Sequence, residues 1–467
     1  MARQGATDPR KTADALNLAK QLSSEHPKDV ATNQLYASLL LDSGARQDVQ
    51  KSLQELKSLV QNNNADPVLH YDLARAYYSQ GDLDKATTEA LEAIRIRGSL
   101  MPARVLAASL YEERGQHGKA LEQTAIVLDK QPRDREARLV RGRALIGLKE
   151  LDKAQQELEA LVRDNPAFPD GIYQLANLYL ARKDYGKAQE EFEKLGPGQQ
   201  HDLRGFVGIQ NVKLRQGHWQ EAVRSMEDLV QKNPDQPSLR ATLANFQAEA
   251  ALQLPQGDER RNALLAQAEN NDKQLLNSPL KSEELLLRLG TLERMLGKNQ
   301  EALSSFEAAS KLSPGNAEAV LNRGMVLESL GERDKARDAY NQALGLDPDN
   351  VIALNNLAFL NAETNQNLDQ AMTYAERAKK RLPGNANVAD TLGYIYYRKG
   401  LTQDAIRELQ SAVESEPKNA SYHLHLAMAL LQRGDKSAAK REAENALRTA
   451  NKSDQQERIR SFMSQIG

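Results

Sequence analysis

The sequence predicts an all-α protein built from repeated pairs of helices, and three observations support that prediction. First, the 467-residue chain is rich in Ala, Leu, Gln, Glu, Lys and Arg and poor in β-branched residues, a composition that favours helix almost throughout. Second, alanine recurs every 34 residues, at Ala86, Ala120, Ala154, Ala188 and Ala222. Third, proline and glycine keep the same period or its multiples, at Pro132, Pro166, Pro234, Gly81, Gly115 and Gly217.

Each period is expected to contain a first helix, a glycine turn, a second helix and a proline stop. Glycine suits the left-handed conformation at a helix end, and proline cannot continue a helix. The alanines fall in the second helix, where a small side chain lets two helices approach closely. Residues 317–350, "AEAVLNRGMVLESLGERDKARDAYNQALGLDPDN", contain every one of these elements.

This pattern resembles the tetratricopeptide repeat (TPR) family. The residues of 317–350 that match the family pattern are Val320, Gly324, Leu327, Gly331, Ala336, Tyr340, Ala343 and Pro348. Residues 386–419 match it with Leu392, Gly393, Tyr396, Gly400, Ala405, Leu409, Ala412 and Pro417. The resemblance covers nearly the whole chain, and it implies a helix-turn-helix solenoid that forms a right-handed superhelix.

The repeat phase divides the chain into five expected segments. They are a second helix of a truncated repeat at 8–27, units 1–6 and the first helix of unit 7 at 30–251, an irregular insertion with the second helix of unit 7 at 252–282, units 8–12 at 283–450, and a capping helix at 453–464. The lone helix at 8–27 suggests that the chain is a piece of a longer protein. Segment 252–282 is either a distorted repeat or a hinge, and continuing apolar periodicity favours distortion.

The composition indicates a protein without catalytic chemistry. The absence of cysteine excludes disulfides, thiolate catalysis and zinc–thiolate sites, and no phosphate-binding glycine loop or HExxH motif is present. A net charge of -2 gives no general attraction to nucleic acid. No uninterrupted apolar stretch is long enough to span a bilayer. We therefore expect no enzyme activity, cofactor or metal, no nucleic-acid partner and no direct membrane insertion.

One arginine-rich stretch, "RDREARLVRGR" at 133–143, is compatible with an anion site. The interleaved acids Asp134 and Glu136 make local ion pairing the favoured interpretation.

The TPR resemblance implies that the first helix of each unit lines a concave surface that holds partners as extended peptides or helices. We call the second, fifth, ninth and twelfth residues of each unit the groove face; the last three of these share one side of a helix. The candidate partner-binding residues on this face are Tyr71, Arg75, Tyr78, Asn177, Asn211, Asn245, Asn355, Phe359, Asp390, Tyr394, Tyr397, Leu424, Met428 and Leu431.

Two features of the groove face suggest how a partner would bind. The asparagines could pair with a peptide backbone, because an amide both donates and accepts, although chance polarity explains them equally well. The C-terminal aromatic and apolar cluster fits a side-chain anchor, unless a neighbouring helix covers it. Tyr396, the eleventh residue of its unit, is expected to pack between helices.

The function expected from this pattern is that of a non-enzymatic protein–protein interaction scaffold. The C-terminal repeats are also similar to long TPR proteins of bacterial envelopes, including those of exopolysaccharide export and the PEP-CTERM system. That similarity implies a periplasmic or envelope location if an upstream export signal was removed, and a cytoplasmic one otherwise. The alternatives are a cytoplasmic adaptor or regulator, and the substrate-gripping arm of an enzyme whose catalytic domain is absent from this chain.

Overall fold

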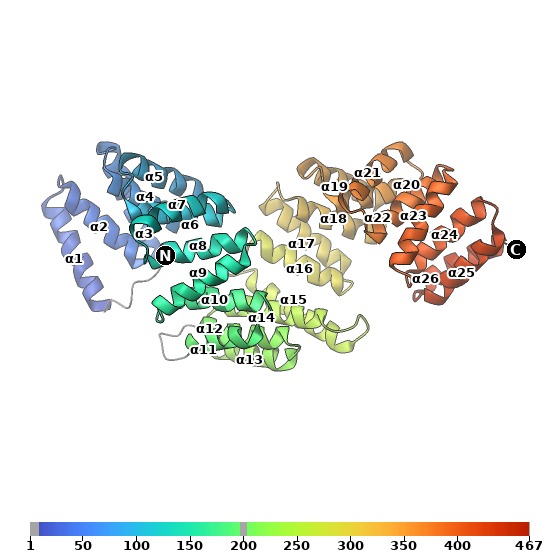
Figure 1. The fold of residues 1–467 in the computed structure, drawn as a ribbon, viewed down its shortest axis with the longest axis horizontal. Helices are drawn as coiled ribbons and strands as arrows, with labels where there is room; N and C mark the ends of the chain where they lie inside the picture. The colour runs from blue at the N-terminus through green and yellow to red at the C-terminus, as the bar shows by residue number, and fades with distance from the viewer. Residues whose placement is uncertain (1–8, 197–202, 467) are drawn as a thin grey trace. The chain divides into compact units, whose positions relative to one another are not determined.

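A computed structural model describes residues 9–196 and 203–466 of the chain. Within these ranges all the regular secondary structure is helical, as Figure 1 shows. The all-α class and the TPR solenoid architecture predicted from the sequence are therefore confirmed. The first residue of the helix expected at 8–27, Asp8, lies outside the described residues, and α1 begins at Pro9.

The chain divides into two compact units, Met1–Ala222 and Val223–Gly467. The helices of the first unit are α1(Pro9–Glu25), α2(Val30–Ser43), α3(Arg46–Asn62), α4(Pro67–Ser79), α5(Leu83–Ile96), α6(Met101–Glu113), α7(His117–Lys130), α8(Arg135–Gly147), α9(Leu151–Asp164), α10(Pro169–Ala181), α11(Tyr185–Lys194) and α12(Leu203–Arg215). The division between the units falls inside the next helix, α13(Trp219–Lys232).

The helices of the second unit continue the alternation. They are α14(Pro237–Leu252), α15(Glu259–Leu275), α16(Glu283–Met295), α17(Asn299–Leu312), α18(Ala317–Ser329), α19(Arg333–Leu346), α20(Val351–Glu363), α21(Leu368–Arg381), α22(Ala386–Arg398), α23(Thr402–Ser415), α24(Ala420–Gln432), α25(Lys436–Thr449) and α26(Ser453–Ile466). None of the helices in the described ranges is both long and apolar enough to cross a bilayer.

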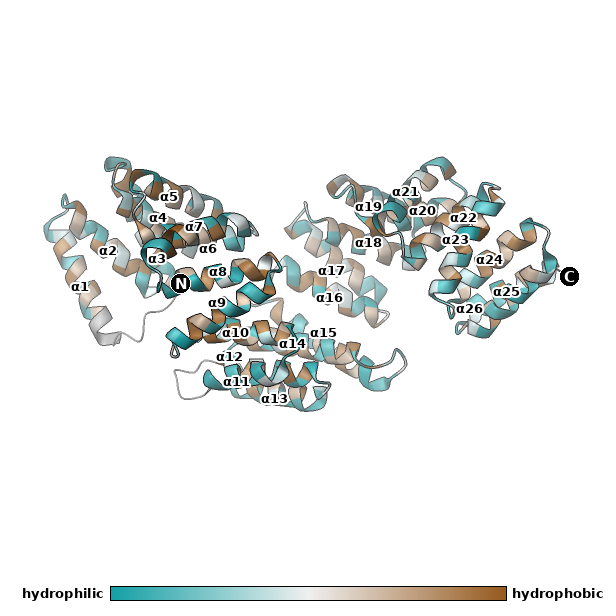
Figure 2. Ribbon diagram, in the orientation of Figure 1, coloured by the Kyte–Doolittle hydropathy of each residue, from teal (hydrophilic) through white to brown (hydrophobic). Residues whose placement is uncertain are grey.

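Consecutive helices pack as antiparallel pairs because small residues lie where the two helices meet. In the α18–α19 pair, Ala336 is fully buried, and a Cβ atom added at Gly324 would lie only 2.7 Å from the Tyr340 ring. The turn between these helices contains Gly331, whose φ of 79° is in the left-handed region that glycine adopts without strain. In Figure 2 individual helices carry both hydrophobic and hydrophilic residues, as expected when one side packs and another meets water.

The segment around 252–282 has an unusually polar interior. α15 begins after Asp258, whose side chain accepts a hydrogen bond from the Arg260 amide at 2.9 Å. Farther along α15, Asp272 is fully buried and binds the Arg288 guanidinium through both carboxylate oxygens, at 2.8 and 2.5 Å. Burial raises the pKa of Asp272, while Arg288 opposes that effect. The amino-acid sequence shows continuing apolar periodicity in this segment but gives no sign of this ion pair.

Candidate functional site

The N-terminal groove residues Tyr71, Arg75 and Tyr78 lie on α4 and already contact other residues of the chain. The Arg75 guanidinium lies over the Tyr71 ring, 5.8 Å from its centroid, and donates to Asp72 at 3.2 Å. The Tyr78 hydroxyl donates to Glu113, and burial together with that hydrogen bond raises the pKa of Tyr78 to about 12. A partner would have to compete with these internal contacts.

The three groove asparagines differ in their surroundings. Asn177 on α10 is half-buried, and its side-chain amide donates to the Tyr173 carbonyl at 2.9 Å. Asn211 on α12 is half-buried as well. Asn245 on α14 is exposed, and its carbonyl oxygen accepts from Arg288 at 2.8 Å. The amides of Asn177 and Asn245 are thus partly used within the chain, and whether the series grips a peptide stays a prediction.

The C-terminal aromatic residues form one cluster across α20, α22 and α24. The ring centroids of Phe359 and Tyr394 are 5.6 Å apart, and those of Tyr394 and Tyr397 are 6.0 Å apart. His425 completes the cluster, with its ring centroid 4.6 Å from that of Tyr394. His425 was not among the predicted groove residues because it is the sixth residue of its unit, one position away from the groove face.

Four of the predicted groove residues do not offer the open surface expected of them. Tyr394 is 8% exposed, Leu424 7%, and Asp390 and Asn355 4% each. Neighbouring helices cover them, which is the alternative that the sequence left open. His425 of α24, for example, reaches Asp390 of α22, where its Nδ1 lies 2.8 and 3.0 Å from the two carboxylate oxygens. Tyr396, expected in the packing between helices, is half-buried.

Four of the C-terminal groove residues, the largely buried Leu424 among them, border a cavity of about 720 Å³ beside α26. Its lining from α22 and α24 is Tyr397, Leu424, Met428, Leu431 and Gln432. Its lining from α26 is Asp454, Glu457, Arg458, Ser461, Phe462 and Gln465. An apolar floor with a polar rim is the arrangement found at protein–protein interfaces. The volume is also in the range of pockets that hold a bulky side chain or a small ligand.

The arginine-rich stretch at 133–143 forms ion pairs within the chain, but only Arg135–Glu136, at 3.3 Å, is one of the local pairs favoured from the sequence. Arg138 donates to Glu157 at 2.9 Å and to Asp164 at 2.7 Å, and Arg143 pairs with Glu112 at 2.6 Å. Glu112 lies on α6, and Glu157 and Asp164 lie on α9, so none of these acids is beside the arginines in the sequence. Helix packing brings them together, so the spacing of charges along α8 alone could not identify them.

The fold defines a helical-repeat protein. Matches to the tetratricopeptide repeat family cover residues 44–102, 105–172, 287–350, 329–386 and 391–455, which together are more than half of the chain. The chain therefore belongs to the tetratricopeptide repeat family.

Individual relatives are distant. The TPR repeat-containing protein PA4667 of Pseudomonas aeruginosa is 23% identical over 245 residues, which are 52% of this chain and 34% of the relative, so the match spans about a third of that relative's length. The structure of yeast Tom70 is similar with 16% identity and a TM-score of 0.36, covering 86% of this chain and 95% of Tom70. A tetratricopeptide repeat protein from Parabacteroides merdae gives 16% identity and a TM-score of 0.44 over 56% and 98% of the two chains.

The family match supports a protein-interaction scaffold, because tetratricopeptide repeat proteins bind protein partners. The matches include no catalytic family.

Proposed function

We propose that this protein is a non-enzymatic scaffold that binds a peptide or helical segment of a partner protein along its groove face. The observation that supports this most is the cavity beside α26, because four residues selected on sequence phase alone, Tyr397, Leu424, Met428 and Leu431, line it together. An apolar partner side chain would enter between α24 and α26, and the polar residues of α26 would surround it.

The partner chemistry follows from the two sides of the cavity. Met428 and Leu431 are half-buried in the free protein, so an inserted apolar group would remove their remaining surface from water. Asp454, Glu457 and Arg458 on α26 are exposed and carry both signs of charge, which suits a partner segment with polar residues flanking an apolar anchor. Such an anchor surrounded by a polar rim is the usual distribution of binding energy at an interface.

Site-specific photo-crosslinking tests this proposal. A benzoylphenylalanine placed at Ser461, on the cavity wall, should capture a defined partner segment, whereas the same group at the exposed Asp338 of α19 should not capture it. The double variant Tyr397→Ser/Leu431→Ser should reduce the Ser461 crosslink at least about tenfold, since two anchor contacts of roughly 1 kcal/mol each are removed. An identical crosslink pattern from Ser461 and Asp338, unchanged in the double variant, would contradict the proposal.

We also propose a cellular location for the protein, the bacterial envelope. The similarity of the C-terminal repeats to envelope TPR proteins supports a role in a bacterial envelope assembly, such as one that exports exopolysaccharide. Cell fractionation of the untagged protein from its source would place it with envelope material if this is correct. Recovery in the cytoplasmic fraction would favour the adaptor alternative. Stoichiometric co-purification with a catalytic subunit would instead favour the role of substrate-gripping arm.

A further inference from the structure

Three repeats of the first unit share a contact between a lysine and a tyrosine eight residues before it. In each case the lysine ammonium lies over the tyrosine ring, at 5.5, 5.4 and 5.3 Å from the ring centroid, in the pairs Lys85–Tyr77, Lys119–Tyr111 and Lys187–Tyr179. Because the pairs recur in phase with the repeat, each occupies the same place in its own repeat. An ammonium over an aromatic face is attracted by the ring quadrupole.

The repeat that starts at residue 135 has a lysine at the equivalent position but no tyrosine eight residues before it. Lys153 lies 34 residues from both Lys119 and Lys187, but the residue eight positions before it is Leu145. A second position has also become smaller. In two of the other repeats, the residue 20 positions before the tyrosine contacts that tyrosine: Lys57 lies over the Tyr77 ring, and Glu159 accepts a hydrogen bond from the Tyr179 hydroxyl at 2.7 Å. In the repeat that starts at residue 135, the residue 20 positions before Leu145 is the small Ala125.

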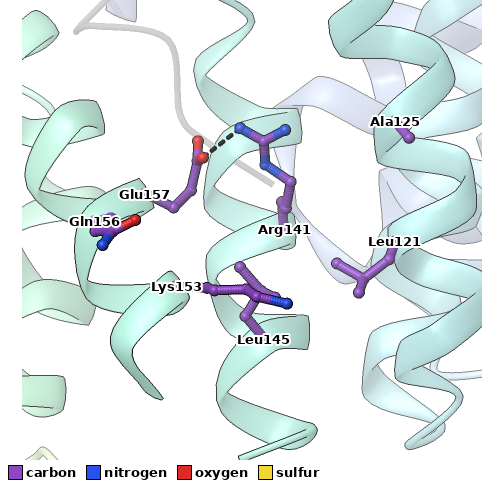
Figure 3. A pocket seen from close by; sticks show the side chains of 7 residues that line it. All are labelled: Leu121, Ala125, Arg141, Leu145, Lys153, Gln156 and Glu157. Atoms are coloured by element: carbon purple, nitrogen blue, oxygen red, sulfur yellow. Dashed lines mark hydrogen bonds and ion pairs between the residues drawn. The ribbon is translucent and has the colours of Figure 1, made fainter. Parts of the chain in front are cut away.

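The combined loss of side-chain volume coincides with a cavity of about 430 Å³ between α7, α8 and α9. Its lining residues are Leu121, Ala125, Arg141, Leu145, Lys153, Gln156 and Glu157, none of which is aromatic. Figure 3 shows Lys153 extended across Leu145, with Leu121 facing them from the neighbouring helix. The Arg141 guanidinium is held on one side by Glu157.

We propose that this cavity binds an aromatic side chain of a partner protein, whose ring takes the place that tyrosine occupies in the sibling repeats. The inference rests on the proposed scaffold function but concerns a different surface. Leu121 and Leu145 supply apolar walls for the faces and edges of the ring. The Lys153 side chain is 71% exposed, and its ammonium pairs with Glu150 at 2.5 Å. Lys85 and Lys187 make the same kind of pair with the acid three residues before them while they lie over their tyrosine rings, so this pair leaves Lys153 able to lie over a ring as well. The arrangement therefore selects aromatic over aliphatic side chains.

Methyl NMR on the full chain with small probes tests the selectivity. N-acetyl-tyrosinamide should shift the methyl resonances of Leu121 and Leu145, and N-acetyl-leucinamide should bind several-fold more weakly. Lys153→Gln should weaken the tyrosine probe about two- to fivefold, the factor expected for an exposed cation–π contact. Equal affinity for the two probes, or no shift at either leucine, would overturn the proposal.

Variants that place a larger side chain in the cavity test whether the cavity accommodates an aromatic ring. Leu145→Tyr restores the residue of the sibling repeats and should abolish probe shifts at Leu121, and Ala125→Glu is a second filling variant if the first disturbs folding. Leu327→Tyr is the matched control, because Leu327 stands eight residues before Lys335 in a repeat of the second unit. It should leave probe binding at Leu121 unchanged. Retained probe shifts in folded Leu145→Tyr would overturn the proposal.

A crosslinking arm distinguishes a partner side chain from a free aromatic ligand. Benzoylphenylalanine at the exposed Gln156 should capture a partner segment that contains an aromatic residue, and Leu145→Tyr should remove that crosslink. If Leu145→Tyr abolishes probe binding and leaves the Gln156 crosslink intact, the occupant is not a partner side chain and the proposal fails. The Ser461 crosslink is independent of these variants, so its presence or absence reports separately on the scaffold function.

Discussion

At the residue scale, the turns of the repeats show how the chain tolerates a non-glycine residue in a left-handed conformation. Gly115 and Gly217 have φ values of 69° and 88°. Lys149 and Lys183 lie at the intermediate multiples of the 34-residue period and have φ values of 62° and 63°. The fold therefore imposes the same backbone on lysine as on glycine. A side chain with a Cβ atom is disfavoured there by about 1 kcal/mol.

Replacing one of these lysines by glycine should consequently stabilise the protein. We expect Lys183→Gly to raise the free energy of unfolding by about 0.5–1 kcal/mol, because relief of strain exceeds the extra entropy of the unfolded glycine chain. Chemical denaturation followed by circular dichroism measures the change. Lys187→Gly, inside α11, is the matched control and should have the opposite sign. Destabilisation by both substitutions would show that the turn carries no relievable strain.

A second prediction at this scale concerns the hydrogen bond from the Tyr179 hydroxyl to Glu159. This bond, followed by one from Gln155, lowers the pKa of Glu159 below its ordinary value near 4.5. A lowered folded-state pKa stabilises the fold above pH 4.5, and the contribution is lost as the pH falls through the folded pKa. Tyr179→Phe should therefore raise the pKa of Glu159, as measured by carboxyl NMR titration.

The same substitution should alter stability in a pH-dependent way. The difference in unfolding free energy between wild type and Tyr179→Phe should be largest near neutral pH and should shrink as the pH falls through the lowered folded-state pKa of Glu159. Glu190→Gln on α11, an exposed carboxylate, serves as a control for general charge effects. A stability difference that stays constant across this range would show that the hydrogen bond does not act through Glu159 ionisation.

At the scale of single elements, the sequence predicted the repeat period and the residues buried between helices, because these depend on contacts within one repeat. Ala336 and Tyr340, for example, are fully buried. It did not predict which groove residues are covered, because that depends on the next repeat. His425 helps to cover Tyr394, with ring centroids 4.6 Å apart, but its position one step away from the groove face carries no periodic signal. The cavity beside Lys153 likewise could not be predicted from one repeat alone, because it is recognised by comparison with the neighbouring repeats that have a tyrosine at the position of Leu145.

The close approach of α18 and α19 gives a prediction for the packing of one element. Ala336→Glu forces a carboxylate into a fully buried contact and should lower the free energy of unfolding by about 2–4 kcal/mol. The matched substitution Ala266→Glu, at an exposed position of α15, should change it by less than about 0.5 kcal/mol. Thermal and denaturant unfolding of the two variants measure the contrast. Equal stability would refute the repeat phase assigned to Ala336.

At the scale of the whole molecule, a repeat protein distributes its stability over many interfaces between neighbours. Each repeat contacts only those adjacent to it, so a local defect should lose its effect over a few repeats. The division of this chain into two compact units, at Ala222 and Val223, adds a place where cooperativity can be interrupted. The polar segment at 252–282 belongs to the second unit, and the sequence-based choice between distortion and hinge there stays a prediction.

The terminal helix α26 provides the test of this nearest-neighbour behaviour. Ile459 is fully buried and packs in one cluster with Ala420, Leu424, Ala446 and Ala450. Ile459→Asp removes that apolar contact and buries a charge, so α26 should detach and expose the adjacent faces of α24 and α25. We expect hydrogen exchange to accelerate strongly in α24–α26, less in α22 and α23, and not at all in α2–α11. Glu457→Asp, at an exposed position of the same helix, should leave exchange unchanged. Acceleration spread evenly over both units would show instead that the repeats unfold as one cooperative whole.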